Sequence, residues 1–325
     1  MSNSGSSSLQ PEKSKNLISW ILASITIFIW GITFVCTKHL LVSFSPLEIL
    51  VIRYFAGYLF LWAMWPKWLH IRKGDNLLFA LAGLAGVTVY QFTENIAISY
   101  TTASNVSIIV AVSPMWTALF SQLFLKDKHI TPWFISGFVI AITGIALVSF
   151  NGEVSFSLNM KGDLIALGSA LSWGLYSVLL SVINRRGYNY IGTARRIFFF
   201  SLLYMIPLTV AGTILFANGA TAETSSAFVK SILFDWTPAA NAARFSSFVN
   251  IGCLAFLGIL ASGFCFMAWN RACDGLGTVR ATIGIYLIPV VTIVFAFFAL
   301  GEEITLMGGI GALLTIAGLV ISEHK

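Results

Sequence analysis

The stretch that decides the fold runs from residue 257 to residue 305 and reads LGILASGFCFMAWNRACDGLGTVRATIGIYLIPVVTIVFAFFALGEEIT. It covers most of two apolar runs, 248–270 and 278–299, joined by a short polar link. Each run is close to the roughly 20 apolar residues that an α-helix needs to cross a bilayer. Because lipid offers backbone groups no hydrogen-bond partner, such runs must be helical. Two consecutive membrane-spanning helices are therefore predicted here.

The same pattern recurs along the whole chain. Its 325 residues are 57% hydrophobic and 10% charged, with a mean hydropathy of +0.86, whereas a soluble domain carries about 25% charged residues. We therefore predict an all-α integral membrane protein of ten transmembrane helices. The predicted spans are 18–37, 47–65, 77–98, 104–125, 133–150, 164–183, 197–216, 248–270, 278–299 and 305–322.

The charged and polar ends of these segments predict the topology. Most of the 19 Lys and Arg residues fall on one side if the N-terminus is cytoplasmic, as the positive-inside rule requires. We expect a multi-pass protein of the bacterial inner (plasma) membrane with both termini in the cytoplasm. The Ser-rich segment 1–16 is predicted to be a disordered cytoplasmic tail, and 217–247 a long external loop.

An internal repeat divides the chain into halves 17–150 and 151–325. Motifs of the first half recur in the second, pairing Trp30-Gly31 with Trp173-Gly174, Arg53 with Arg196, Gly83 with Gly258, Asn95 with Asn270, Pro114 with Pro289, Gly137 with Gly311 and Gly144 with Gly318. Each half holds five spans. Because five is odd, the second half must enter the membrane from the opposite face, which predicts two inverted five-helix repeats.

The residues 257–305 resemble the EamA-type members of the drug/metabolite transporter superfamily. The resemblance lies in the Trp-Asn-x-Ala element at 269–272, the Tyr-Leu-x-Pro-Val element at 286–290 and Gly-Glu at 301–302, with a fainter copy in the first half. It implies a carrier, often an exporter of amino acids or related metabolites, with a cavity lined by spans one, three, four, six, eight and nine. The first half departs from the pattern, with Lys126-Asp127-Lys128 in place of Gly-Glu.

Those spans contain a set of aromatic, amide and acidic side chains that we predict to bind substrate. Polar side chains inside a bilayer need partners, so they should face the protein interior. About half are expected to line the cavity and the others to join helices. The set is Trp30, Tyr90, Glu94, Asn95, Trp116, Trp173, Tyr176, Trp269, Asn270 and Tyr286.

Four further features have two interpretations. Pro114 and Pro289 lie in the middle of the fourth and ninth spans, where proline frees a backbone carbonyl; they are either hinges or packed kinks. Arg53 and Glu94 carry charge inside spans, at about 2.5–3.5 kcal/mol each on insertion scales. They form a structural ion pair, or Glu94 faces the cavity and carries a coupling proton or binds a substrate amine.

Other functional classes are disfavoured. The four His residues lie at span ends or in loops, and no spacing of metal ligands, paired carboxylates or phosphate-binding loop occurs. We therefore expect no cofactor, no metal, no nucleic-acid partner and no enzymatic activity. The favoured function is secondary transport, as an exporter of a small polar metabolite such as an amino acid or derivative. The alternative is an uncoupled facilitator or exchanger of another metabolite class, such as nucleotide- or sugar-linked compounds.

Overall fold

A computed structural model describes residues 9–150, 160–221, 223, 225–300 and 306–322, and every regular element in them is helical. Eight helical segments are long and apolar enough to cross a membrane: Asn16–Leu40, Pro46–Met64, Asn76–Tyr100, Val106–Leu125, Met160–Asn184, Tyr190–Ala217, Phe248–Leu276 and Thr278–Ala299. Two shorter apolar helices are Pro132–Gly144 and Gly309–Ser322. The predicted all-α membrane class is confirmed.

The helices follow the predicted spans closely, although several are divided. The first half contains α1 (Leu9–Leu40), α2 (Pro46–Met64), α3 (Asn76–Gly83), η1 (Leu84–Val89), α4 (Tyr90–Tyr100), α5 (Ala103–Val110), α6 (Ser113–Phe120), η2 (Ser121–Leu125) and α7 (Pro132–Phe150). The second contains α8 (Met160–Asn184), α9 (Tyr190–Ala217), α10 (Ala227–Ile232), α11 (Pro238–Phe245), α12 (Phe248–Ala255), η3 (Phe256–Phe264), α13 (Cys265–Leu276), α14 (Thr278–Ile283), η4 (Gly284–Leu287), α15 (Ile288–Leu300) and α16 (Leu306–Ser322).

The first helix is longer than predicted. It begins at Leu9, inside the segment 1–16 that we expected to be disordered. Pro11 falls in its first turn, where the missing backbone N–H costs no helical hydrogen bond. The helix therefore extends past the apolar run towards the N-terminus; residues 1–8 lie outside the described part of the chain.

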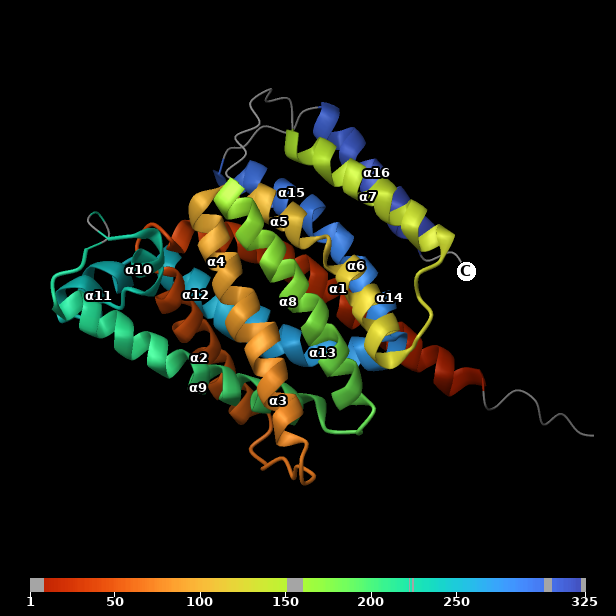
Figure 1. Cartoon of the computed structure of the whole chain (residues 1–325), viewed down its shortest axis with the longest axis horizontal. Coiled ribbons are helices and arrows are strands. Elements are labelled where there is room, and N and C mark those ends of the chain that lie inside the picture. The colour runs from red at the N-terminus through yellow and green to blue at the C-terminus, as the bar shows by residue number, and fades with distance from the viewer. Residues whose placement is uncertain (1–8, 151–159, 222, 224, 301–305, 323–325) are drawn as a thin grey trace, which may run out of the picture.

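The two ends of the molecule differ in what they carry. The predicted external loop 217–247 contains α10 and α11, which lie together beside the start of α12 (Figure 1). We call this the loop end. At the opposite end, Lys128 and Arg185 line one pocket, and Arg72 and Arg271 contact Tyr188 and Tyr190 at the neighbouring connection; we call it the basic end.

Breaks in the helices occur at equivalent places in the two halves. Residues 111–112 separate α5 from α6, and the 3₁₀ turn η4 separates α14 from α15. Pro114 and Pro289 each lie in the first turn after the break, where the missing N–H would have no partner. The π-helical segments η1 and η3 likewise follow, or include, the paired glycines Gly83 and Gly258.

Helix packing is reciprocal between the halves. The first helix, α1, packs against α13 and α15, while α8 packs against α4 and α6. A Cβ atom on Gly31 would lie 2.5 Å from Val291 Cγ1, and one on Gly174 would lie 2.6 Å from Trp116 Cβ. Both glycines therefore allow a close helix approach, as small residues do in membrane proteins.

The helices α7 and α16 form a separate pair that runs side by side (Figure 1). A Cβ atom on Gly137 would lie 2.6 Å from Gly318 O, and one on Gly144 would lie 2.6 Å from Gly311 O. The repeat pairs Gly137 with Gly311 and Gly144 with Gly318. If each glycine is replaced by its partner, the contact between Gly137 and Gly318 becomes the contact between Gly311 and Gly144. The contact is therefore the same from either half.

Candidate functional site

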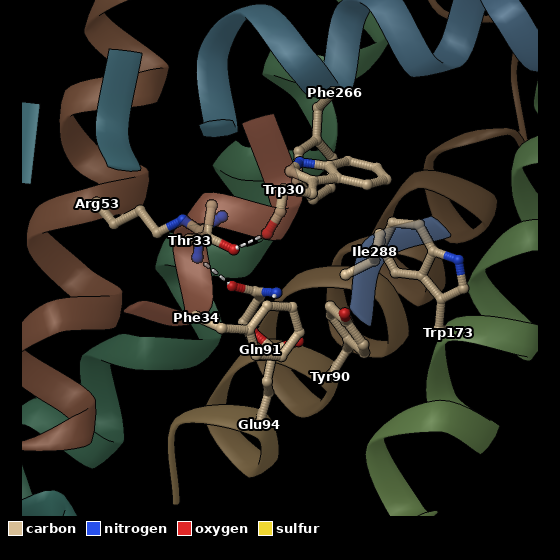
Figure 2. A pocket seen from close by; sticks show the side chains of 10 residues that line it. All are labelled: Trp30, Thr33, Phe34, Arg53, Tyr90, Gln91, Glu94, Trp173, Phe266 and Ile288. Atoms are coloured by element: carbon tan, nitrogen blue, oxygen red, sulfur yellow. Dashed lines mark hydrogen bonds between the residues drawn. The ribbon is translucent and has the colours of Figure 1, made fainter. Parts of the chain in front are cut away.

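A small cavity lies at the centre of the helix bundle, enclosed by helices from both halves. We call it the central cavity. Its lining residues are Trp30, Thr33, Phe34, Arg53, Tyr90, Gln91, Glu94, Trp173, Phe266 and Ile288 (Figure 2). Its volume is about 20 Å³, enough for one water molecule. Ligand pockets usually measure about 300–1,000 Å³, so this conformation is closed around its centre.

One wall of the cavity is a row of buried polar side chains. Arg53 on α2 donates from Nε to Ser262 Oγ at 2.6 Å and from Nη1 to Gln91 Oε1 at 2.5 Å. On α4, Gln91 Nε2 donates to Glu94 Oε1 at 3.4 Å. Arg53 is 2% exposed and Glu94 is 3% exposed. The row therefore places a guanidinium and a carboxyl group in a site that is almost without solvent.

The direct ion pair between Arg53 and Glu94 is not among the ion pairs of the described residues. Gln91 lies one helical turn before Glu94, and its amide joins the two charges by accepting from one and donating to the other (Figure 2). The carboxylate still lines the cavity. It therefore faces the central cavity and is not held by a direct cationic partner among the described residues.

The other wall is aromatic. Trp30 and Trp173 meet edge to face with ring centroids 5.2 Å apart, and Tyr90 packs against Trp173 at 4.7 Å. Trp30 Nε1 donates to the backbone oxygen of Ala261 at 3.0 Å. That carbonyl belongs to the π-helical segment η3. The irregular segment thus holds the Trp30 ring, and the repeat partners Trp30 and Trp173 face each other across the halves.

Three predicted residues lie away from the central cavity lining. Asn95 donates from Nδ2 to Pro46 O at 3.2 Å, which joins α4 to the start of α2. Trp116 packs against Gly174 and stacks on Phe120. Tyr286 is buried in a separate apolar cluster with Phe134.

Trp269, Asn270 and Tyr176 lie behind the cavity wall. The Trp269 ring is 5.0 Å from that of Trp30, and the Tyr176 ring is 5.0 Å from that of Trp173. Tyr176 Oη donates to Asn270 Oδ1 at 3.5 Å. These residues therefore form a layer next to the cavity rather than its surface.

Two larger pockets open at the ends of the bundle. The basic-end pocket measures about 680 Å³ and is lined by residues that include Asp127, Asn184 and Cys273. The loop-end pocket measures about 620 Å³ and is lined by residues that include Glu48 and Arg244. Both are large enough for a metabolite. The closed centre lies between them.

Sequence reasoning missed Thr33, Phe34, Gln91, Phe266 and Ile288, which also line the central cavity. The signal that could have found three of them is helical spacing. Thr33 and Phe34 follow Trp30 by one turn, and Gln91 precedes Glu94 by one turn, so each shares a helix face with a predicted residue. Within the described residues, no group of three or more His, Cys, Asp or Glu side chains could hold a metal ion.

Known proteins resemble this chain in sequence and in fold. The model of the EamA-like transporter family matches residues 17–150 and again 160–322. An uncharacterized transporter of Archaeoglobus fulgidus is 26% identical over 94% of this chain and 97% of its own length. A probable terminal-alkyne amino-acid exporter of Streptantibioticus cattleyicolor is 25% identical over 78% of this chain and 75% of its own. A solved crystal structure superposes with a TM-score of 0.66 and 17% identity over 96% of both chains, which shows the fold alone.

Proposed function

Because the chain belongs to the EamA-like transporter family, we propose that it is a secondary transporter that exports a small polar metabolite, such as an amino acid or derivative. It is a multi-pass membrane protein, and transport of this kind is not an enzymatic activity. The substrate class is supported by the relative named as an amino-acid exporter. Substrate would bind at the central cavity and leave by alternating access.

The observation that carries this proposal is a closed polar centre between two open pockets. The central cavity holds the buried charges of Arg53 and Glu94 in about 20 Å³, while the pockets at either end measure about 680 and 620 Å³. A buried charge inside a span is costly, and in membrane proteins it usually marks a substrate or ion pathway. The arrangement suits a carrier captured in an occluded state.

An inverted repeat would supply the two states. The reciprocal contacts of Gly31 with Val291 and of Gly174 with Trp116 support such a relation. The two matches of the family model support it further. We propose that the two shorter apolar helices complete a set of ten spans, five in each half. The halves can then exchange conformations and open the same cavity to either side.

The orientation follows from the charges at the two ends. We propose that the basic end faces the cytoplasm and the loop end the exterior of a bacterial inner membrane, as the positive-inside rule predicts. The basic-end pocket would then receive substrate from the cytoplasm. The loop-end pocket would release it.

We propose that Glu94 couples transport to protons or binds a substrate amine. Its carboxylate lines the central cavity, and Gln91 holds it apart from the Arg53 guanidinium. A carboxylate that is not directly paired can exchange a proton or an ammonium group without breaking an ion pair. The charged or titratable groups around it are Arg53, Tyr54 and Tyr90.

The test is transport by purified protein in liposomes. The vesicles are loaded with unlabelled amino acids and labelled amino acid is supplied outside, so that an exchanger accumulates label by counterflow. Accumulation by wild-type protein, absent from empty vesicles, supports the proposal. Accumulation that is confined to nucleotide- or sugar-linked compounds would favour the alternative substrate class. In vesicles that hold no unlabelled amino acid, equilibration of label without concentration, with or without a proton gradient, would indicate an uncoupled facilitator.

A further inference from the structure

A second polar cluster lies between the central cavity and the basic-end pocket. It consists of Trp173, Tyr176, Trp269 and Asn270, and we call it the donor cluster. Trp173 also lines the central cavity. On the other side, Asn184 lines the basic-end pocket and donates from Nδ2 to the backbone oxygen of Asn270 at 3.1 Å. The cluster therefore contacts the lining of both spaces.

The donor cluster contains three N–H groups that have no acceptor among the described residues. They are Trp173 Nε1, Trp269 Nε1 and Asn270 Nδ2. Their side chains are 3%, 0% and 0% exposed. The indole of Trp30, beside them, does donate, to Ala261 O at 3.0 Å. A buried donor without a partner costs about 1–3 kcal/mol, so three in one cluster indicate a ligand that accepts hydrogen bonds.

The chemistry of the cluster selects the kind of ligand. The side-chain oxygen of Asn270 already accepts from Tyr176 Oη at 3.5 Å, and no acidic residue belongs to the cluster. The ring faces pack on one another, with Trp173 and Tyr176 5.0 Å apart and Trp30 and Trp269 5.0 Å apart. That leaves little aromatic face for a cation. A carboxylate, with two oxygens and about four lone-pair positions, matches three donors.

We propose that the donor cluster is a carboxylate subsite, in which Trp173, Trp269 and Asn270 donate to the substrate's carboxylate on its way through the protein. The inference rests on the proposed transport function and adds the group that is recognised. Glu94 lies on the first half and the donors lie on α8 and α13 of the second half. The two sites would hold opposite ends of one zwitterion.

The test compares two substrates that differ only in the carboxylate. Phenylalanine and phenethylamine form one pair, and leucine with isopentylamine forms a second, each measured in proteoliposomes. Asn270→Asp replaces the Nδ2 donor with a carboxylate oxygen of nearly the same shape, which repels a substrate carboxylate and attracts an amine. Trp269→Phe removes the indole N–H and keeps an aromatic ring. The matched controls are Asn218→Asp and Trp133→Phe, both at exposed positions.

For Asn270→Asp we expect transport of the amino acid to fall by about tenfold or more, the fold-change of losing a hydrogen bond to a charged group. Transport of the amine should change by less than about threefold, so the preference between them shifts by at least several-fold. Trp269→Phe should shift the preference in the same direction by a smaller factor. The two controls should leave it unchanged. Size-exclusion profiles and thermal unfolding in detergent establish that each variant is folded.

If folded variants lose transport of the amino acid and of its matching amine equally, the carboxylate subsite is overturned, while the proposed transport function stands. If Asn270→Asp does not fold, the test is the ratio of amino-acid transport to amine transport in Trp269→Phe. A wild-type protein that transports neither amino acid nor any other carboxylate-bearing metabolite would instead overturn the proposed function, and this inference with it.

Discussion

Breaking the buried ion pair at the loop end should destabilise the protein strongly. Glu48, in the first turn of α2, accepts from Arg244 Nη1 at 2.9 Å, and the two side chains are 3% and 9% exposed. Glu48 also accepts from the backbone N–H groups of Ser45 at 2.8 Å and Asp235 at 2.9 Å. The pair therefore joins α2 of the first half to α11 of the second half and to the connection that precedes α11.

The change is Arg244→Met, which keeps a flexible unbranched stem, shorter than that of arginine, and removes the charge. It leaves the Glu48 carboxylate buried, and removal of one partner of such a pair costs about 3–5 kcal/mol. The two backbone donors remain, so we expect about 3 kcal/mol, the lower end of that range. Glu48→Gln alone should cost less, because Arg244 still donates to the Asp235 backbone oxygen and to Asn241 Oδ1.

The assay is a double-mutant cycle. The free energy of unfolding of each variant is measured in a mild detergent to which SDS is added as the denaturant. The double variant Glu48→Gln/Arg244→Met buries no uncompensated charge, so it should recover about 2 kcal/mol relative to Arg244→Met. A double variant whose loss equals the sum of the two single losses would refute the reasoning, because it would mean that the charges do not interact. The matched exposed change Arg185→Met, at a pair with 58% and 37% exposure, should cost under about 1 kcal/mol.

Three other predictions concern the central cavity and the helix contacts. Glu94→Gln should transport substrate with no stimulation by a proton gradient; a stimulation equal to that of wild type would exclude coupling at this residue. Gly174→Ala should reduce folded yield and stability by about 1–3 kcal/mol, since its Cβ would lie 2.6 Å from Trp116 Cβ, whereas Gly168→Ala, with nothing within 4 Å, should be tolerated; equal effects would contradict the close packing. Pro114→Ala and Pro289→Ala should preserve binding but slow exchange if the helix breaks are hinges, and unchanged exchange rates would identify packed kinks.

The helices could be predicted because their length and apolar character are imposed by the bilayer. The span predicted at 47–65 is Pro46–Met64, and that at 77–98 is Asn76–Tyr100. The divisions within spans could not be predicted, because a π-helical turn such as that in η3 has the same apolar composition as an α-helical turn. Gly83 and Gly258, which the repeat pairs, flank or lie in the two π-helical segments, but their pairing alone did not predict an irregular helix there.

Sequence reasoning named part of the central cavity lining, because it gives depth along a helix but not the rotation of the helix. Depth along a span can be counted in the sequence, which placed Arg53 and Glu94 at similar levels. Hydropathy does not determine which neighbour stands between two side chains, and Gln91 occupies that place. The partner of Arg244 was equally hidden, because Glu48 is almost 200 positions away. Only the docking of the loop end on α2 brings them together.

The central claim is that one cavity opens in turn to the two ends of the protein. Double electron–electron resonance can measure it directly, with spin labels at Val42 and Lys230 across the loop-end pocket and, in a second sample, at Lys128 and Leu276 across the basic-end pocket. Addition of a transported substrate should lengthen one distance while it shortens the other. Two distances that both stay constant, or that lengthen together, in protein that still transports would contradict alternating access.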